Sequence, residues 1–301
     1  MKHIIYILYK NIQTYFAYLI NSLFYLSIKN PLPVKAWVNI THGKLVSNNW
    51  GDDLNMFLLP LIAKRDVIVV NRSLFHILKK ASNYLCIGSI LGDYEDEKSE
   101  IWGAGVMSDE DEIKARPKAI YSVRGKLSRK KLVDAGIDCP EIYGDPALLL
   151  SHYYIPQINK KYKMGIIPNH IDNSNKNIKS FLECHPDCML INMSGYNLWT
   201  DIIDNICSCE YIVSSSLHGL IVADSYKIPN TWVFFSDNIL GGEFKYLDYF
   251  SSVDRNETSP IRIRSKEDIG FLYNNHPKEN KCTIDFQKII ESCPFRYNVE
   301  K

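Results

Sequence analysis

Three consecutive serines and a histidine stand where the sequence changes from a strand pattern to a helix pattern. Aromatic and β-branched residues at 211–213 are typical of a buried strand, and apolar residues at helical spacing follow over 217–223. A helix N-terminus binds anions through its free N–H groups, and serine is a preferred capping residue there. His218 adds a group that titrates near neutral pH in the first turn. This stretch therefore predicts an anion site with a proton donor or acceptor beside it, and its serines are Ser214, Ser215 and Ser216.

Arg124 is a second candidate for binding such an anion. It follows the strand pattern of residues 119–123, so we expect it at the carboxyl edge of a parallel sheet. The planar guanidinium group matches a carboxylate or a phosphate through its paired N–H donors. A surface arginine that caps the next helix is the alternative interpretation.

Three further turns carry polar or small residues at expected strand ends. An acidic side chain in the first turn can accept a proton from a hydroxyl group, although an aspartate that caps the helix opening at Leu54 is an equally good interpretation. Glycine in the other two turns permits a close approach of the backbone to a ligand. The first turn, in "NNWGDDLN", contributes Asn49, Gly51, Asp52 and Asp53, and the others contribute Gly88, Ser89, Gly103 and Gly105.

Alternating strand and helix patterns fill the chain from residue 30 onward, which predicts an α/β fold with mostly parallel sheets. The first strand is expected over residues 34–40. We predict two Rossmann-like domains, 30–155 and 156–301, which face each other across a cleft, and a final helix that could return to the first domain. Strand ends and loops of both halves would then meet in the cleft, where ligands bind in such folds.

The N-terminal segment, residues 1–29, is apolar and rich in tyrosine. Lys10, Asn11 and Gln13 interrupt it, so neither apolar run reaches the ~20 residues that a membrane-spanning helix needs. A helix that lies in a membrane interface and a helix that docks on its own protein fit the pattern equally well.

The composition excludes some classes of function. The 301 residues are 46% hydrophobic with a net charge of +1, so no global field attracts nucleic acid. No cleavable signal peptide is recognisable, and we expect the eight cysteines to be free thiols in a reducing cytoplasm. We expect no metal site, because the candidate ligands lack the C-x2-C spacing of common zinc modules. Those candidates are Cys184, His185, Cys188, Cys207 and Cys209.

An ordered set of phrases resembles the polysaccharide pyruvyl transferase family. From about residue 45 to about residue 253 these are "NWGDDLN", "IGSIL", "IWGAGV", "VRGKLSRKKL", "YGDPALLL", "SSSLHGLIVADSYKIPN" and "EFKYLDYFSSV". The resemblance implies transfer of the pyruvyl group of phosphoenolpyruvate onto two hydroxyls of a sugar, as a cyclic ketal. It also implies a fold similar to two-domain GT-B glycosyltransferases, and no cofactor beyond the donor substrate.

The resemblance assigns roles to several residues. Arg124 matches the arginine that the family uses on the donor, His218 matches the family's histidine, and Lys245 matches a basic position, although a solvated lysine is equally plausible there. His218 would be a general acid or a phosphate partner, and Asp52 a proton acceptor. Part of the family has an arginine where this chain has Ser216, before Leu217. The donor site is thus expected to comprise Arg124, Ser214, Ser215, Ser216, Leu217, His218 and Lys245, while Asp145 fixes a turn before Pro146.

Two other functions remain open at this point. A nucleotide-sugar glycosyltransferase would share the architecture, with Glu243 as its ribose-binding acid. A non-catalytic saccharide-binding module would have kept only the fold. For the transferase we expect a lipid-linked sugar acceptor. We expect the enzyme in the cytoplasm, at the inner face of the cell membrane, with residues 1–29 in peripheral contact with it.

Overall fold

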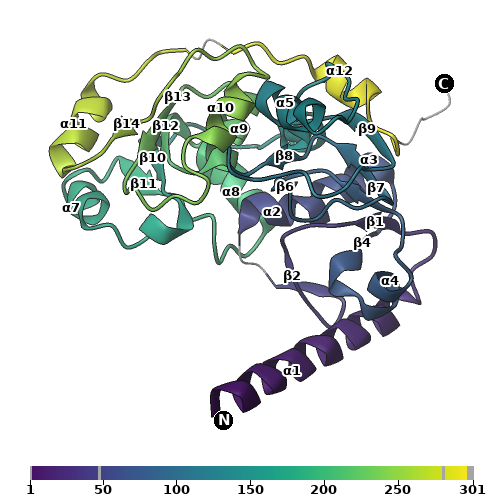
Figure 1. Cartoon of the computed structure of the whole chain (residues 1–301). Coiled ribbons are helices and arrows are strands. Elements are labelled where there is room, and N and C mark those ends of the chain that lie inside the picture. Colours follow the sequence, from purple (N-terminus) through teal and green to yellow (C-terminus); the bar gives the residue numbers. More distant parts are fainter. Residues whose placement is uncertain (1, 47–48, 280–281, 297–301) are drawn as a thin grey trace.

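Two five-stranded parallel sheets form the frame of the computed structural model, which describes residues 2–46, 49–279 and 282–296 (Figure 1). In the first sheet the strand order is β4-β1-β5-β7-β9. Its strands are short, and β4 and β7 are buried along their whole length. The bounds are β1 (Leu32–Val34), β4 (Val67–Val69), β5 (Asn83–Leu85), β7 (Ser99–Trp102) and β9 (Ala119–Ser122).

The second sheet has the order β11-β10-β12-β13-β14, and every neighbouring pair is parallel. Its strands are β10 (Tyr162–Ile167), β11 (Cys188–Leu190), β12 (Cys209–Ser214), β13 (Asn230–Phe234) and β14 (Ile261–Arg262). The α/β class with parallel sheets is thereby confirmed. Two small pairs complete the strands: the antiparallel hairpin β2 (Asn39–Thr41) and β3 (Lys44–Val46), and the parallel pair β6 (Ser89–Leu91) and β8 (Gly105–Val106).

The strand predicted over residues 34–40 is wrong. The chain leaves the sheet after Val34 and pairs again only at Asn39. Between them, Ala36 finds its hydrogen bonds on the side chain of Asn71, which accepts from its N–H (3.3 Å) and donates to its carbonyl (3.1 Å). A side chain distant in sequence thus replaces the sheet partner that the apolar pattern led us to expect.

Helices cover the sheets and connect the strands. In the first half they are α2 (Trp50–Asp53), η1 (Leu54–Met56), α3 (Leu58–Ala63), η2 (Val70–Arg72), α4 (Leu74–Leu78), α5 (Lys126–Asp134), η3 (Pro146–Leu149) and α6 (Leu150–Tyr153). In the second half they are η4 (His170–Asp172), α7 (Lys176–Cys184), α8 (Trp199–Cys207), α9 (Leu217–Ser225), α10 (Phe244–Phe250) and α11 (Lys266–Asn274).

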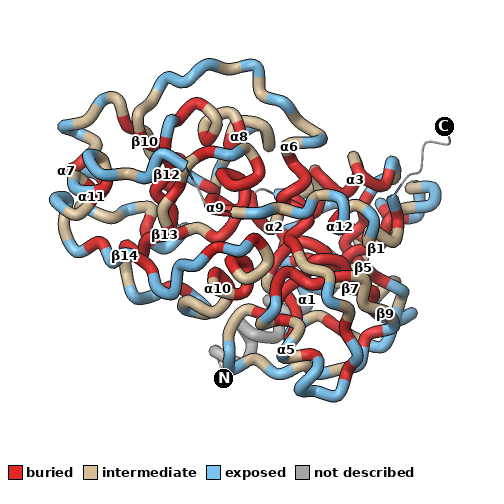
Figure 2. The backbone as a smooth tube through the Cα atoms, turned by 90° about the horizontal axis from the view of Figure 1, so that it is seen from above, coloured by how far each residue is buried: buried red, intermediate tan, exposed pale blue. Residues whose placement is uncertain are grey.

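Helix α9 lies between the two halves and is buried on all sides (Figure 2). All its residues are buried, and its polar side chains Asp224 and Ser225 have hydrogen-bond partners in the interior. Ser225 at its end donates a hydrogen bond to the carbonyl of Leu148 in η3 (2.7 Å). One continuous hydrophobic core therefore runs through both halves, from Leu32 in β1 to Ile212 in β12.

The last helix, α12 (Phe286–Glu291), lies against the first sheet (Figure 1). Trp102 in β7 donates its indole N–H to the carbonyl of Ile289 (3.2 Å). The ring of Phe295 packs edge-on against Tyr84 and Trp102, with centroid distances of 4.9 and 5.3 Å. The last helix thus packs on the first half of the molecule.

Helix α1 (Lys2–Tyr25) projects away from the body of the molecule (Figure 1). Its end is held by Asn21, which donates to the carbonyl of Arg72 (2.9 Å), and by Ser22, whose hydroxyl lies 2.9 Å from that of Ser73. Further from the body, Ile12 and Phe16 are exposed. Within the described residues, no helix combines the length and the apolarity that a membrane crossing requires.

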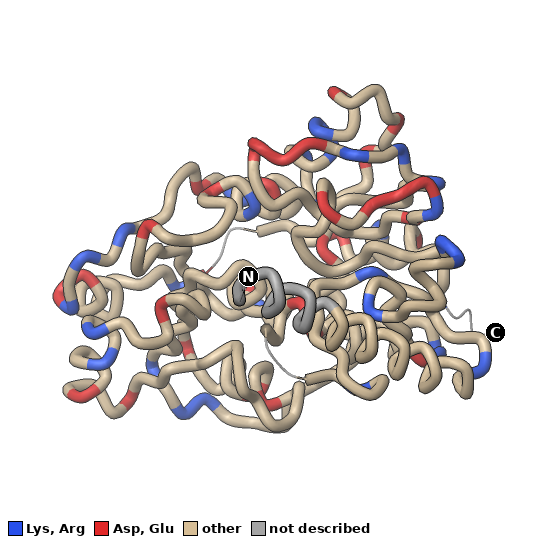
Figure 3. Tube along the Cα trace, turned by 60° about the horizontal axis from the view of Figure 1, so that its bottom comes forward, with Lys and Arg blue, Asp and Glu red and all other residues tan. Residues whose placement is uncertain are grey.

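Charges of both signs are spread over the outside of the molecule, with acidic residues gathered in the loops 93–97 and 109–112 (Figure 3). All eight cysteines are free. In the part of the chain that the structure describes, His, Cys, Asp and Glu side chains form no group of three or more that could hold a metal ion.

Candidate active site

A cavity of about 310 Å³ opens between the two halves. Most of its walls are loops that follow the carboxyl ends of β10, β11, β12 and β13, which is where open parallel sheets bind ligands. The first half contributes Trp37, Asn49, Asp52, Ser89, Ile90 and Met107. The second half contributes Pro168, Asn169, His170, Ile171, Met193, Ser194, Ser216, Leu217, His218, Asn238, Leu240 and Lys245. Of the residues predicted from the sequence, Asn49, Asp52, Ser89, Ser216, Leu217, His218 and Lys245 therefore meet in one place.

The turn between β12 and α9 divides its serines into two roles. Ser214 accepts a hydrogen bond from the N–H of Ser216 (3.0 Å), and Ser215 accepts one from the N–H of Asn169 (2.8 Å). Both are fully buried and fix the turn against the loop after β10. Ser216 lines the cavity at the N-cap position of α9, and its hydroxyl makes no capping bond. The free end of α9 thus faces the cavity, as an anion site requires.

His218 lies in the first turn of α9 with its ring packed against Gly51 of α2. A Cβ added at Gly51 would lie 2.1 Å from Nδ1 of the histidine, so only glycine admits the ring in this position. Helix α2 is held there from the second half, because the N–H of Trp50 donates to the carbonyl of Met193 (2.8 Å). Burial, and then the charges of Arg124 and Lys245, lower the pKa of His218 to about 3. The imidazole is therefore neutral at pH 7 in the unliganded protein.

Asp145 lies behind His218, and sequence reasoning gave it only the turn. Its Oδ1 accepts from the N–H of Ala147 (2.9 Å), as a turn-fixing aspartate would. Its Oδ2, however, points to Nε2 of His218 at 3.9 Å, and neither of these buried atoms has a hydrogen-bond partner among the described residues. Burial raises the pKa of Asp145 to about 7. The two groups form a carboxyl–imidazole pair that a small movement would bring into hydrogen-bond distance.

Asp52 carries a second carboxyl group and lines the cavity directly. The amide of Asn49 donates to its Oδ2 (2.6 Å), while Gly88, at a φ of +122°, brings the backbone close to Oδ1. Burial raises its pKa to about 7, and Lys245 partly opposes that rise. Such a carboxyl group both donates and accepts protons near neutral pH. Its neighbour Asp53 points the other way and accepts from the hydroxyl of Tyr196 (2.9 Å).

Arg124 lies behind the cavity wall and is fully buried. Its guanidinium group donates to Ser89 Oγ (2.5 Å), to the carbonyl of Val106 (2.6 Å) and to Oδ2 of Asp248 (2.9 Å). A Cβ at Gly105 would lie 2.3 Å from its Cζ, so this glycine lets strand β8 pack on the guanidinium group. Arg124 thus acts on the cavity indirectly. It holds Ser89, which lines the cavity, and its positive charge adds to the electrostatic potential there. Asp248, the carboxylate that balances this charge, was not among the residues predicted from the sequence.

Lys245 in α10 presents an ammonium group to the cavity. It is buried apart from the part that lines the cavity, and Nζ donates to the carbonyl of Leu240 (2.8 Å). Burial, and then the charge of Arg124, lower its pKa to about 8. The lysine therefore holds a positive charge at pH 7 beside the N-terminus of α9. Gly103, by contrast, lies outside the cavity. Its φ is +87°, and because it has no Cβ, Pro146 can pack closely against it.

Several lining residues were not predicted from the sequence. Trp37, Asn169, Ser194 and Asn238 come from four separate loops, and none belongs to a recognisable motif. Their positions depend on how the strands align, which local patterns do not contain. For Asp145 the sequence signal was the phrase "YGDPALLL", which predicted a turn before Pro146 and no contact with His218.

Comparison with known proteins agrees with the chemistry of this cavity. A family model described as polysaccharide pyruvyl transferase matches residues 101–233. The uncharacterized protein L143 of Acanthamoeba polyphaga mimivirus is 30% identical over 208 residues, which cover 67% of this chain and 70% of that protein. The succinoglycan biosynthesis protein ExoV of Rhizobium meliloti (strain 1021) is 31% identical over 240 residues, which cover 72% of this chain and 66% of that protein. No solved structure matches the chain significantly.

These matches do not favour the nucleotide-sugar glycosyltransferase or the non-catalytic module. The matched region, residues 101–233, contains Arg124, Asp145 and the turn that carries His218. The chain belongs to the polysaccharide pyruvyl transferase family.

Proposed function

We propose that the protein transfers the pyruvyl group of phosphoenolpyruvate onto two hydroxyls of a saccharide, forming a cyclic ketal during polysaccharide biosynthesis. The observation that carries this proposal is the composition of the cavity. It combines an ammonium group and a helix N-terminus, which suit a doubly anionic donor, with a carboxyl group whose pKa is about 7. Phosphoenolpyruvate brings a phosphate and a carboxylate, which the positive part of the cavity would bind. The proton transfers of the reaction need the titratable carboxyl group of Asp52.

In this proposal the donor lies between Lys245 and the start of α9. The ammonium group and the N–H groups after Ser216 bind the phosphate and the carboxylate, and His218 hydrogen-bonds to one of them. The hydroxyl of Ser89 donates a hydrogen bond to phosphoenolpyruvate, while the guanidinium group of Arg124 donates to Ser89 Oγ from behind. The buried charge of Arg124 then favours the anion without a direct contact.

The chemistry proceeds through two oxocarbenium-like centres. A proton adds to the methylene carbon of phosphoenolpyruvate, and a hydroxyl of the acceptor bonds to the neighbouring carbon and loses its proton. Inorganic phosphate leaves with the electrons of its C–O bond. The second hydroxyl then bonds to the same carbon, and its proton is released. One hydroxyl proton restores the catalytic acid, and the other leaves with phosphate.

Asp52 and His218 divide the proton transfers. Asp52, at a pKa of about 7, gives a proton to the donor and takes one from the acceptor. The bound donor cancels part of the positive field of Arg124 and Lys245, so the pKa of His218 rises when the site is filled. Asp145, behind Nε2, stabilises the imidazolium that results. His218 then serves as a phosphate partner and a general acid.

We also propose that the halves 30–155 and 156–301 act as two Rossmann-like domains of the GT-B type, and that the acceptor is lipid-linked at the cytoplasmic face of the membrane. Helix α1 contains Lys2 and Lys10 and no aspartate or glutamate, and Ile12 and Phe16 are exposed on it. Such a helix suits an anionic bilayer surface.

The full chain should sediment with phosphatidylglycerol vesicles, and Phe16→Asp should weaken this more than Phe271→Asp on α11. Equal sedimentation of both variants contradicts the membrane role.

The donor assignment is tested by thermal unfolding with phosphoenolpyruvate and with a panel of nucleotide sugars. A ligand that binds only the folded state raises the melting temperature. We expect a rise with phosphoenolpyruvate that is lost in His218→Ala and in Lys245→Met. A rise with a nucleotide sugar alone, or with neither ligand, would overturn the assignment.

A further inference from the structure

Trp37 is an exposed aromatic residue on the wall of the catalytic cavity, with 48% of its surface accessible. The residues on either side, Ala36 and Val38, are buried. Side chains of η2 hold the backbone of both neighbours. The amide of Asn71 bonds the N–H and the carbonyl of Ala36, and Nε of Arg72 donates to the carbonyl of Val38 (3.0 Å). The indole is thus presented outward by a backbone that is fixed on both sides.

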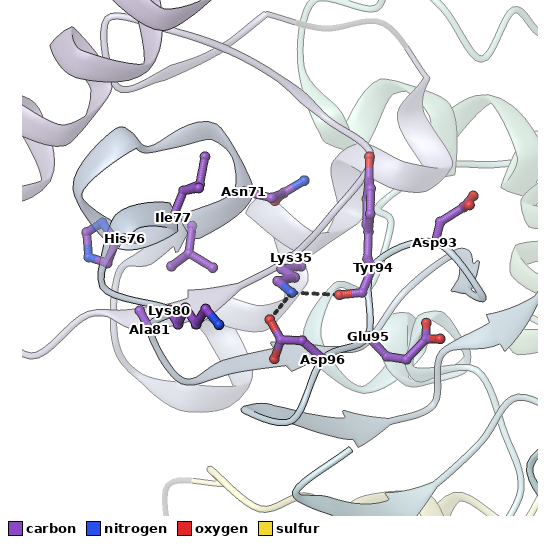
Figure 4. Close-up of a pocket in the computed structure, with 11 residues that line it drawn as sticks. Lys35, Asn71, His76, Ile77, Lys80, Ala81, Asp93, Tyr94, Glu95 and Asp96 are labelled. Carbon is purple, nitrogen blue, oxygen red and sulfur yellow. Dashed lines mark hydrogen bonds and ion pairs between the residues drawn. The ribbon is translucent and has the colours of Figure 1, made fainter. Parts of the chain in front are cut away.

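Tyr94 supports the indole from one side. The two rings are stacked, with a centroid distance of 6.1 Å and an angle of 26° between their planes. Lys35 fixes Tyr94 in turn, because its Nζ donates to the carbonyl of Tyr94 (2.7 Å) and pairs with Asp96 (2.5 Å; Figure 4). These contacts lie in a second cavity of about 290 Å³. The offset contact with Tyr94 leaves 48% of Trp37 accessible, and the indole lines the catalytic cavity.

The cavity that Trp37 lines also carries neutral polar side chains. Amide and hydroxyl side chains there come from both halves of the molecule, and each can donate and accept hydrogen bonds. Two exposed apolar residues, Ile171 and Leu240, stand at the rim. The ammonium group of Lys245 and the imidazole of His218 are buried by comparison. The neutral polar residues are Asn49, Asn169, Ser194 and Asn238.

We propose that the open face of Trp37 is the platform on which a pyranose ring of the acceptor stacks. A pyranose has an apolar face of C–H groups and a rim of hydroxyls, which match one open aromatic face and neutral amides around it. The ring would direct its hydroxyls toward Asp52, where the proposed function needs them. This inference rests on the proposed function for the identity of the acceptor, and on the Trp37 geometry for its position.

Saturation-transfer NMR on the full chain tests the platform. The probes are the methyl glycosides of glucose, galactose and mannose, and the variants are Trp37→Ala and Trp37→Phe. Phe271→Ala is the matched control, because it removes an exposed aromatic ring from α11, outside the cavity. We expect transfer to the ring C–H protons of at least one glycoside in the wild type, in Trp37→Phe and in Phe271→Ala. In Trp37→Ala the apparent Kd should rise roughly tenfold.

Melting temperature with phosphoenolpyruvate provides an independent measurement on the same four proteins. An unchanged melting response in Trp37→Ala shows that the variant is folded and that its donor site is intact. Equal transfer in the wild type and in Trp37→Ala, or no transfer in the wild type, overturns the platform. If phosphoenolpyruvate fails to bind while the glycosides behave as expected, the proposed function fails and the saccharide platform stands.

Discussion

Gly51 packs directly against the ring of His218, which makes a single methyl group a sharp probe of the site. In Gly51→Ala the new Cβ would lie 2.1 Å from Nδ1 and 2.5 Å from Cγ, whereas real Cβ atoms essentially never approach another heavy atom within 3.0 Å. The ring must therefore move by about 1 Å, and it is buried against other groups on most sides. We expect it to turn toward the cavity and out of line with Asp145.

The size of the effect follows from the lost hydrogen bond. A hydrogen bond to a charged partner contributes about 1.5–3 kcal/mol, and about 1.4 kcal/mol corresponds to a tenfold change in affinity. The Kd for phosphoenolpyruvate should therefore rise roughly 10- to 100-fold. The free energy of unfolding should change less, because alanine is a better helix former than glycine by about 1 kcal/mol and overpacking costs about 1–3 kcal/mol.

The assay is the melting temperature as a function of phosphoenolpyruvate concentration, which gives an apparent Kd for each variant. Gly270→Ala in α11 is the matched control, since a Cβ there meets nothing closer than Phe181 at 4.0 Å. The control should keep the wild-type Kd and gain up to ~1 kcal/mol of stability. A wild-type Kd in Gly51→Ala would refute the reasoning, because the ring would then not be held by this contact or would not meet the donor.

Three further predictions follow from buried charges. The pKa of Asp52 is about 7 in the folded protein and near 3.8 in the unfolded chain, so the native state binds the extra proton between these values and loses stability as pH rises through them. Asp52→Asn should therefore be more stable than the wild type in urea unfolding. This difference in the free energy of unfolding should be larger at about pH 8 than at about pH 4, by on the order of 1–3 kcal/mol, and a difference that does not change with pH would contradict the argument. Asp248→Ala leaves the guanidinium group of Arg124 buried without its carboxylate and should cost about 3–5 kcal/mol in the same assay, whereas a loss below about 1 kcal/mol would show that the pair is not needed. Because the pKa of Lys245 is about 8, donor affinity should fall as pH rises through that value, and Lys245→Arg should remove this dependence; the same pH profile in both proteins would argue against a contact.

The sequence by itself was enough for the class of fold and for the turn that carries the histidine. Hydrophobic runs of strand length alternate with helical patterns, and these patterns are local. The serines, Leu217 and His218 follow β12 directly, so their place at the carboxyl end of a strand follows from the chain order. The ordered motifs then led to the family without knowledge of any distance.

Tertiary structure decided which of the candidates face the cavity and which lie behind its wall. Arg124 and Ser216 both follow a strand, yet the arginine is enclosed by Asp248 and Ser89 while the serine faces the cavity. Local patterns predict only a turn for Asp145. Its contact with His218 joins residues 73 positions apart in the chain, and no local pattern contains such a contact. Trp37 was placed in a strand because its apolar neighbours fit one. Burial and charge pairing depend on the packing of segments distant in sequence, and periodicity within one segment does not contain that information.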